Sequence, residues 1–156
     1  MKKIEFIIRA AVIGAVYASL TYLLKPISYG PIQVRVSEAL TLLPLLDSSS
    51  VLGLFAGCMI ANILGGLGPW DIYAGSLITL IAAYLTGKMP NEYLGAIWPI
   101  ILNALGVSYY LSFLYNMPYW ITVFYIAAGE AIAVIFLGIP LIRFIKRSVL
   151  IKYFKK

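Results

Sequence analysis

The sequence of 156 residues has no histidine, a single cysteine and few charged residues. Without histidine, the chain can have no histidine acid–base catalysis, histidine metal site or Ser/His or Cys/His nucleophile pair. Cys58 alone can form neither an internal disulfide nor a thiolate metal cage, and the apolar run around it predicts a packing role. Charged residues make up 12% of the chain, against about a quarter in soluble domains, which excludes a water-soluble globule.

Apolar residues, in contrast, make up 62% of the chain and occur in long runs. This composition is typical of a small polytopic membrane protein, whose helices are surrounded by lipid and by one another. The net charge of +6 does not indicate nucleic-acid binding, because the basic residues are not spread over an exposed face. They gather near the two chain ends, at Lys2, Lys3, Arg9, Arg143, Lys146, Arg147, Lys152, Lys155 and Lys156.

This charge bias predicts that both termini are cytoplasmic and that the number of membrane crossings is even. The start of the chain also resembles a signal peptide, with a tolerable cleavage site at 16–18. Cleavage there is the alternative, and it would leave an odd number of crossings with the termini on opposite sides.

The apolar runs and their breaks predict an all-α membrane protein, a six-transmembrane-helix bundle in one integral membrane domain covering 1–156. A bilayer core of about 30 Å needs about 20 helical residues, so several of the predicted helices are too short to cross alone. The stretch 47–50 is predicted to form an inner turn and an N-cap. The predicted helices cover 4–24, 36–46, 51–64, 72–86, 93–115 and 119–144.

Two breaks that contain glycine and proline, at 26–33 and 65–71, fall on the same predicted outer face. Each lies beside a shortened helix and carries polar residues. Non-helical backbone at membrane depth persists only where it lines protein or a water-filled cavity. The breaks therefore favour a binding pocket near the outer surface. Ordinary connecting loops at the level of the lipid headgroups are the alternative.

Polar residues inside the apolar helices are the candidates for such a pocket, because a lipid-facing carboxylate costs several kcal/mol. Glu130 lies near the middle of the last predicted helix, among small residues that leave room beside it. A ligand role is favoured, and a paired glutamate that joins two helices is the alternative. Asn103, in the fifth predicted helix, offers both a donor and an acceptor, and it suits an interhelical hydrogen bond or a ligand equally.

The two breaks supply further candidates. Ser37 is predicted to cap the second helix. Glu38 has two possible roles: a structural one, in which the helix dipole or a pair with Arg35 stabilises it, or contact with a ligand. Asp71 is predicted to cap the fourth helix, while Trp70 suits an interfacial anchor or a stacking platform. An aromatic belt near the outer surface is predicted from Tyr109, Tyr110, Tyr115, Tyr119, Trp120 and Tyr125.

The first predicted helix carries small residues spaced three and four apart, at Ala11, Gly14, Ala15 and Ala18. Such faces let helices pack closely in lipid. This face serves either packing within the chain or docking onto another membrane subunit, and the sequence does not decide between the two.

The stretch 29–44, YGPIQVRVSEALTLLP, resembles the signature of the QueT family. These proteins are proposed substrate-binding S components of energy-coupling-factor (ECF) transporters for queuosine precursors. The resemblance continues at 57–62 (GCMIAN), 70–76 (WDIYAGS), 103–105 (NAL) and 129–130 (GE), and it covers nearly the whole chain. The first stretch is long enough to be specific, whereas the later pieces are weak by themselves.

The resemblance implies a multi-pass, six-helix S component in a bacterial cytoplasmic membrane, with a mobile first outer loop over its pocket. It also implies a complex with one membrane coupling subunit (the T component) and two ATPase subunits. In S components an alanine motif on the first helix contacts the coupling subunit, and Ala11-x-x-x-Ala15 matches that motif. The chain has no G-x-x-x-x-G-K-[ST] loop, so it cannot itself hydrolyse ATP, and it is expected not to be an enzyme.

The implied substrate is a 7-deazaguanine such as pre-queuosine-1 or queuine, and no cofactor is implied. Its adjacent N–H and amine can bind one carboxylate as a fork, its ring can stack on aromatics, and an aminomethyl group would engage a second carboxylate. Glu130 and Glu38 are the expected pair, with Asp71 in reserve. The expected supporting contacts are Asn103, Asn62, Gln33, Trp70 and Arg35. The alternatives are an S component for another planar vitamin, a small membrane enzyme, or a scaffold subunit without a ligand.

Overall fold

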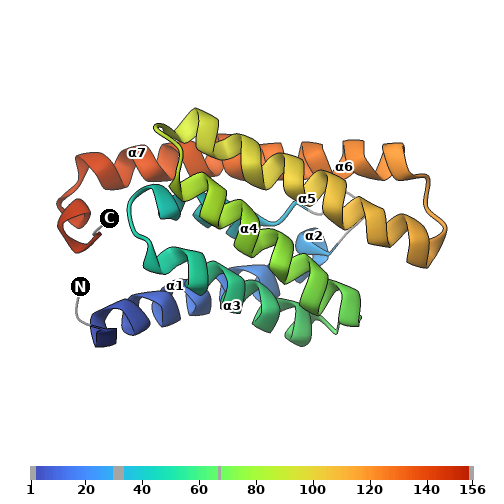
Figure 1. Cartoon of the computed structure of the whole chain (residues 1–156), viewed down its shortest axis with the longest axis horizontal. Helices are drawn as coiled ribbons and strands as arrows, with labels where there is room; N and C mark the ends of the chain where they lie inside the picture. Colours follow the sequence, from blue (N-terminus) through green and yellow to red (C-terminus); the bar gives the residue numbers. More distant parts are fainter. Residues whose placement is uncertain (1–2, 30–33, 67, 155–156) are drawn as a thin grey trace.

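The computed structural model describes residues 3–29, 34–66 and 68–154, and these residues form helices and connecting turns but no strands. The helices form an elongated bundle in which α1 (Lys3–Leu23) begins, and α7 (Ile139–Arg147) ends, at the same end (Figure 1). Between them, in chain order, lie α2 (Lys25–Ser28), η1 (Val36–Leu45), α3 (Ser49–Gly65), η2 (Asp71–Gly75), α4 (Ser76–Gly87), α5 (Glu92–Tyr115), α6 (Tyr119–Ala131) and η3 (Ile132–Gly138), and η4 (Val149–Tyr153) follows α7.

Helix length separates two groups within the described part of the chain. Three helices are long and apolar enough to cross a membrane: Lys3–Leu23, Glu92–Tyr115 and the continuous run Tyr119–Arg147. The shorter apolar helices are Val36–Leu45, Ser49–Gly65 and Asp71–Gly87. The all-helical fold predicted from the sequence is therefore confirmed, while the number of six crossings and the cytoplasmic termini stay predictions.

Local chemistry explains where several helices begin and end. The Asn91 side chain accepts hydrogen bonds from the backbone N–H groups of Tyr93 and Leu94 and so caps the start of α5. Gly66, with a φ of 71°, ends α3 in the left-handed conformation that glycine adopts without strain. Asn116, with a φ of 52°, ends α5 in the same region, two residues before Pro118.

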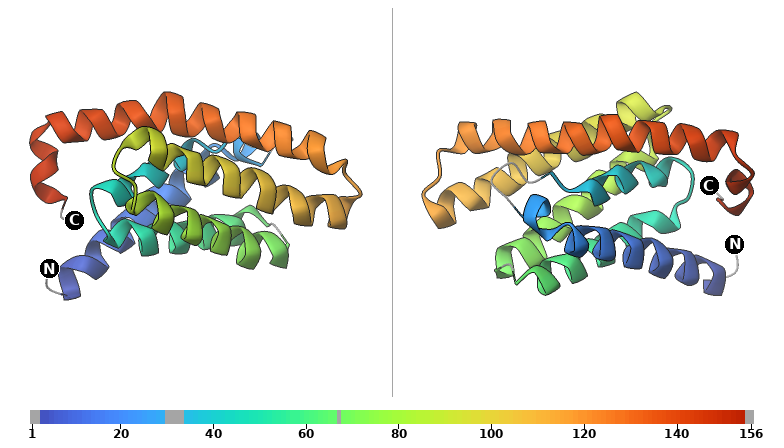
Figure 2. Two further views of the ribbon diagram at one scale, coloured as in Figure 1. Left: turned by 45° about the horizontal axis from the view of Figure 1, so that its top comes forward. Right: turned by 180° about the vertical axis from the view of Figure 1, so that it is seen from behind.

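Helices α1 and α3 lie side by side (Figure 2), and glycines allow their backbones to approach closely. A β-carbon added to Gly14 would lie 2.8 Å from the backbone oxygen of Gly53, and one added to Gly57 would lie 2.6 Å from the backbone oxygen of Gly14. Gly14 and Ala18 are buried in this contact. These two members of the predicted small-residue stripe therefore pack within the chain.

The short helix η1 lies in the interior of the bundle, where it contacts α1, α3, α4, α5, η3 and α7 (Figure 2). Eight of its ten residues are buried, and Leu42 is completely inaccessible to solvent. Its leucines form a core cluster with Val134, Ile139 and Ile142. η1 is a 3-10 helix, a form that rarely extends beyond a few residues, and Pro44 within it lacks the N–H donor of other residues. Because η1 is buried on most sides, Glu38 on this helix lies inside the protein.

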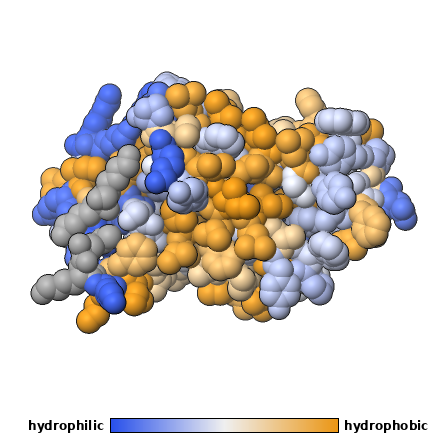
Figure 3. All heavy atoms as spheres, in the orientation of Figure 1, coloured by the Kyte–Doolittle hydropathy of each residue, from blue (hydrophilic) through white to orange (hydrophobic). Residues whose placement is uncertain are grey.

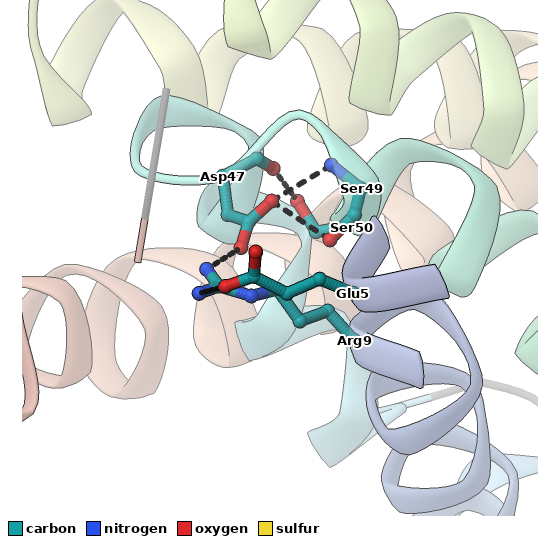
Figure 4. Close-up of polar contacts among 5 residues, drawn as sticks. All are labelled: Glu5, Arg9, Asp47, Ser49 and Ser50. Atoms are coloured by element: carbon teal, nitrogen blue, oxygen red, sulfur yellow. Dashed lines mark hydrogen bonds and ion pairs between the residues drawn. The ribbon is translucent and has the colours of Figure 1, made fainter. Parts of the chain in front are cut away.

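In Figure 3, hydrophilic residues gather at the end of the bundle where α1 begins, and an apolar band covers the middle of the face. The ion pairs of Arg9, Glu92 and Asp47 make this the charged end of the bundle. At the charged end, Asp47 accepts hydrogen bonds from the Arg9 guanidinium and from the backbone N–H and hydroxyl of Ser49 (Figure 4). Arg143 and Lys146 both form ion pairs with Glu92, which join α7 to the start of α5.

Candidate functional site

The main polar cluster joins Glu38 on η1, Asn103 on α5 and Glu130 on α6. The Asn103 side-chain nitrogen donates to Glu130 Oε1 at 3.0 Å and, more weakly, to Glu38 Oε2 at 3.5 Å. The three side chains are between 1% and 4% exposed. One amide, which has two N–H groups, thus bridges two carboxyl groups inside an otherwise apolar bundle.

The two carboxyl groups of this cluster are unequally satisfied. Glu38 Oε1 also accepts a short hydrogen bond from the Tyr17 hydroxyl of α1. Glu130 Oε2 is buried and has no hydrogen-bond partner among the described residues. A buried polar atom without a partner costs about 1–3 kcal/mol. This atom is therefore the best acceptor in the cluster for the donor of a bound molecule.

Arg35 lies beside this cluster with its guanidinium largely buried. Its Nε donates to the backbone oxygen of Ser28 at 3.4 Å, and its carbon Cζ lies 5.4 Å from the centre of the Tyr29 ring. Among the described residues, no carboxylate lies within 4.0 Å of the guanidinium, so the ion pair between Arg35 and Glu38 considered from the sequence does not form. Arg35 still acts on Glu38 through its charge.

A second polar cluster joins α3, η2 and α5. The Tyr110 hydroxyl donates to Asp71 Oδ1 at 2.9 Å, and the Asn62 side-chain nitrogen donates to the backbone oxygen of Asp71 at 2.7 Å. The predicted helix cap at Asp71 is wrong, because the helical backbone already begins at Pro69 and the carboxylate points to another helix. The π-helical turn η2, a form frequent at functional sites, carries Asp71 into the bundle.

Other predicted residues lie apart from the two clusters or on their margins. Trp70 is 51% exposed beside Asp71. Ser37 does not cap η1, because its hydroxyl is hydrogen-bonded to the Thr21 hydroxyl at 2.6 Å. Gln33 lies outside the residues that the structure describes. Most of the predicted aromatic belt is exposed, whereas Tyr110 is buried.

Sequence reasoning missed Tyr17, and it assigned Tyr110 to the belt. Tyrosine is common both in apolar helices and at membrane surfaces, so neither position stood out. The sequence did indicate that Tyr110 faces the interior, because it follows Asn103 by seven residues and therefore shares its helix face. Cys58 is fully buried in a core cluster, but it also accepts hydrogen bonds from Asn62 and Thr79.

Ala11 and Ala15 on α1 are exposed. They line an apolar groove of about 450 Å³ between α1 and α3. A second groove of about 420 Å³ adjoins it and shares Ala15 and Ile60 with it. The two exposed alanines are thus available to another molecule, while the buried Gly14 and Ala18 lie at the floor of these grooves.

The fold defines an all-helical membrane protein whose polar side chains gather inside the bundle. Comparison with known families matches the QueT transporter family over residues 7–147, and the chain belongs to this family. A protein of Lactococcus lactis subsp. cremoris (strain MG1363), described as "Queuosine precursor transporter QueT", is 40% identical over 78 residues. The aligned stretch covers 48% of this chain but only 45% of that relative. No solved structure matches the chain.

Proposed function

We propose that this chain is the substrate-binding S component of an ECF importer and that it binds a 7-deazaguanine precursor of queuosine at the cluster of Glu38, Asn103 and Glu130. Membership of the QueT transporter family supports the general class of cargo. The main support for this location of the ligand is Glu130 Oε2, a buried acceptor without a partner among the described residues.

The donors and acceptors of the cluster suit this type of ligand. A 7-deazaguanine presents a ring N–H and an exocyclic amine side by side, and a carboxylate accepts such a pair as a fork. Glu130 offers the free oxygen for this fork, while Asn103 and Tyr17 hold the neighbouring acceptors in place. Arg35 could donate to the ring carbonyl, because its Nη2 makes no hydrogen bond to the described residues.

The first test is binding of the aminomethyl-7-deazaguanine to the purified protein. Glu130→Gln should weaken binding at least about tenfold, because a hydrogen bond to a charged group contributes about 1.5–3 kcal/mol. Glu92→Gln, which changes a carboxylate at the charged end of the bundle, is the matched control and should bind normally. Normal binding by Glu130→Gln would refute the site. Stronger competition by a thiamine-like or riboflavin-like compound would refute the cargo.

The groove along α1 supports the assignment as an S component, because two adjoining apolar grooves with exposed alanines suit a close-packed partner helix. Ala15→Trp should abolish co-purification with the coupling subunit and substrate uptake but leave ligand binding intact. Leu105→Trp, at an exposed position on α5, is the control for adding bulk. Loss of ligand binding in Ala15→Trp would indicate that the position serves packing within the chain.

A further inference from the structure

The two polar clusters lie along one interior line of the bundle. Asn103 and Tyr110 share a face of α5 and are seven residues apart, which corresponds to about 10 Å along a helix. Asn103 contacts Glu130, and Tyr110 contacts Asp71. One face of α5 thus connects a carboxylate at one level with a second carboxylate about two turns away.

Buried polar groups continue across the space between the two clusters. Cys58 and Asn62, four residues apart, share a face of α3. The Cys58 sulfur accepts from Asn62 at 3.6 Å and from Thr79 at 3.5 Å, and Arg35 Nη1 lies 4.0 Å from it. Cys58 thus lies between Arg35, beside the first cluster, and Asn62, in the second. The clusters are therefore two ends of one polar region.

The end around Asp71 has acceptor atoms that no described residue satisfies. Asn62 Oδ1 and the Ser76 hydroxyl are buried without a hydrogen-bond partner in the described part of the chain. Asp71 Oδ1 accepts from Tyr110, but its second oxygen Oδ2 has no donor among the described residues. A carboxylate oxygen, an amide oxygen and a hydroxyl together match the three N–H donors of a primary ammonium group.

From this arrangement we infer a second subsite, formed by Asp71, Asn62, Ser76 and Tyr110, that binds a primary amine carried by the ligand. The inference rests on the proposed function, in which the ring occupies the cluster of Glu38, Asn103 and Glu130. A separation of about 10 Å along α5 suits a planar bicyclic base that extends a short amine-bearing substituent toward Asp71. The ring and the substituent are thus recognised by different carboxylates, and Asp71 selects the aminomethyl form.

The test compares dissociation constants for 7-deazaguanine with an aminomethyl group, with a cyano group, and without a substituent. The wild-type chain should prefer the aminomethyl compound over the unsubstituted ring by at least about tenfold, the contribution of one charge-assisted contact. Asp71→Asn should reduce this preference to less than about threefold and leave the affinity for the unsubstituted ring unchanged. Glu130→Gln should weaken all three compounds by a similar factor.

Two further variants distinguish loss of the subsite from a change in folding. Tyr110→Phe removes only the hydroxyl that orients Asp71, so it should lower the aminomethyl preference while the protein remains monodisperse. Tyr109→Phe, at an exposed neighbouring position, should behave as the wild type. An unchanged preference in Asp71→Asn, or an equal loss for all three compounds, would overturn the subsite. If the wild type binds none of them, the proposed function fails, and the subsite fails with it.

Discussion

Asp47, shown in Figure 4, and Glu130 are both buried carboxylates, but their surroundings differ. Asp47 accepts from Arg9 at 2.9 Å through one oxygen and from Ser49 through the other. Glu130 has one oxygen bonded to Asn103 and the other without a partner in the described residues. A fully bonded carboxylate stabilises the fold, whereas an incompletely bonded one has capacity for a ligand.

The contact between Arg9 and Asp47 can be measured by a double-variant cycle. Arg9→Gln should lower the free energy of unfolding by about 3 kcal/mol, because it leaves a buried carboxylate without its cation. With Asp47→Asn and the double variant, the coupling energy in detergent micelles should exceed about 1 kcal/mol. Lys146→Gln removes an exposed ion pair with Glu92 and should cost less than about 1 kcal/mol. A coupling energy near zero would show that the contact does not stabilise the protein.

Sequence reasoning at the residue scale found Glu38, Asn103 and Glu130, because polar side chains in apolar helices avoid lipid. It could not determine the partners, since hydrogen bonds between residues 27 to 65 positions apart depend on how the helices pack. Asp71 was misplaced for a local reason. Aspartate after a glycine-proline break is a common helix cap, and no sequence pattern reveals the π-helical turn that redirects it.

At the scale of elements, the contact of α1 with α3 depends on the absence of side chains. Gly57→Ala should lower the free energy of unfolding by about 1–3 kcal/mol, because the new methyl group would meet the backbone of Gly14 and force the helices apart. Gly68→Ala is the control, since no atom lies within 4 Å of the position of its β-carbon. Thermal unfolding of the purified variants measures both. Equal midpoints for the two variants would contradict the close contact.

The helical segments themselves could be predicted from the sequence, and α1 and α5 begin and end within one residue of the predicted bounds. The 3-10 form of η1 and the π form of η2 could not, because these helices differ from α-helices in hydrogen bonding rather than in composition. The interior position of η1 also depends on its neighbours. Its short length indicated only that it does not cross a bilayer alone.

At the scale of the whole molecule, the charged end and the apolar band predict an orientation in the membrane. Variants with one added cysteine can test it, since the native Cys58 is fully buried. Met117→Cys, between α5 and α6, should react with a membrane-impermeant maleimide added outside intact cells. Lys88→Cys, between α4 and α5, should react only after the membrane is permeabilised. Reaction of both from the outside would contradict six crossings with cytoplasmic termini.

The interior position of η1 has a consequence for biosynthesis. η1 is synthesised early, but it packs against η3 and α7, which leave the ribosome about a hundred residues later. Until then the leucines that will contact Val134, Ile139 and Ile142 lack those partners. Nascent chains that stop before residue 132 should therefore remain sensitive to protease at η1. Synthesis of η3 and α7 should make η1 resistant.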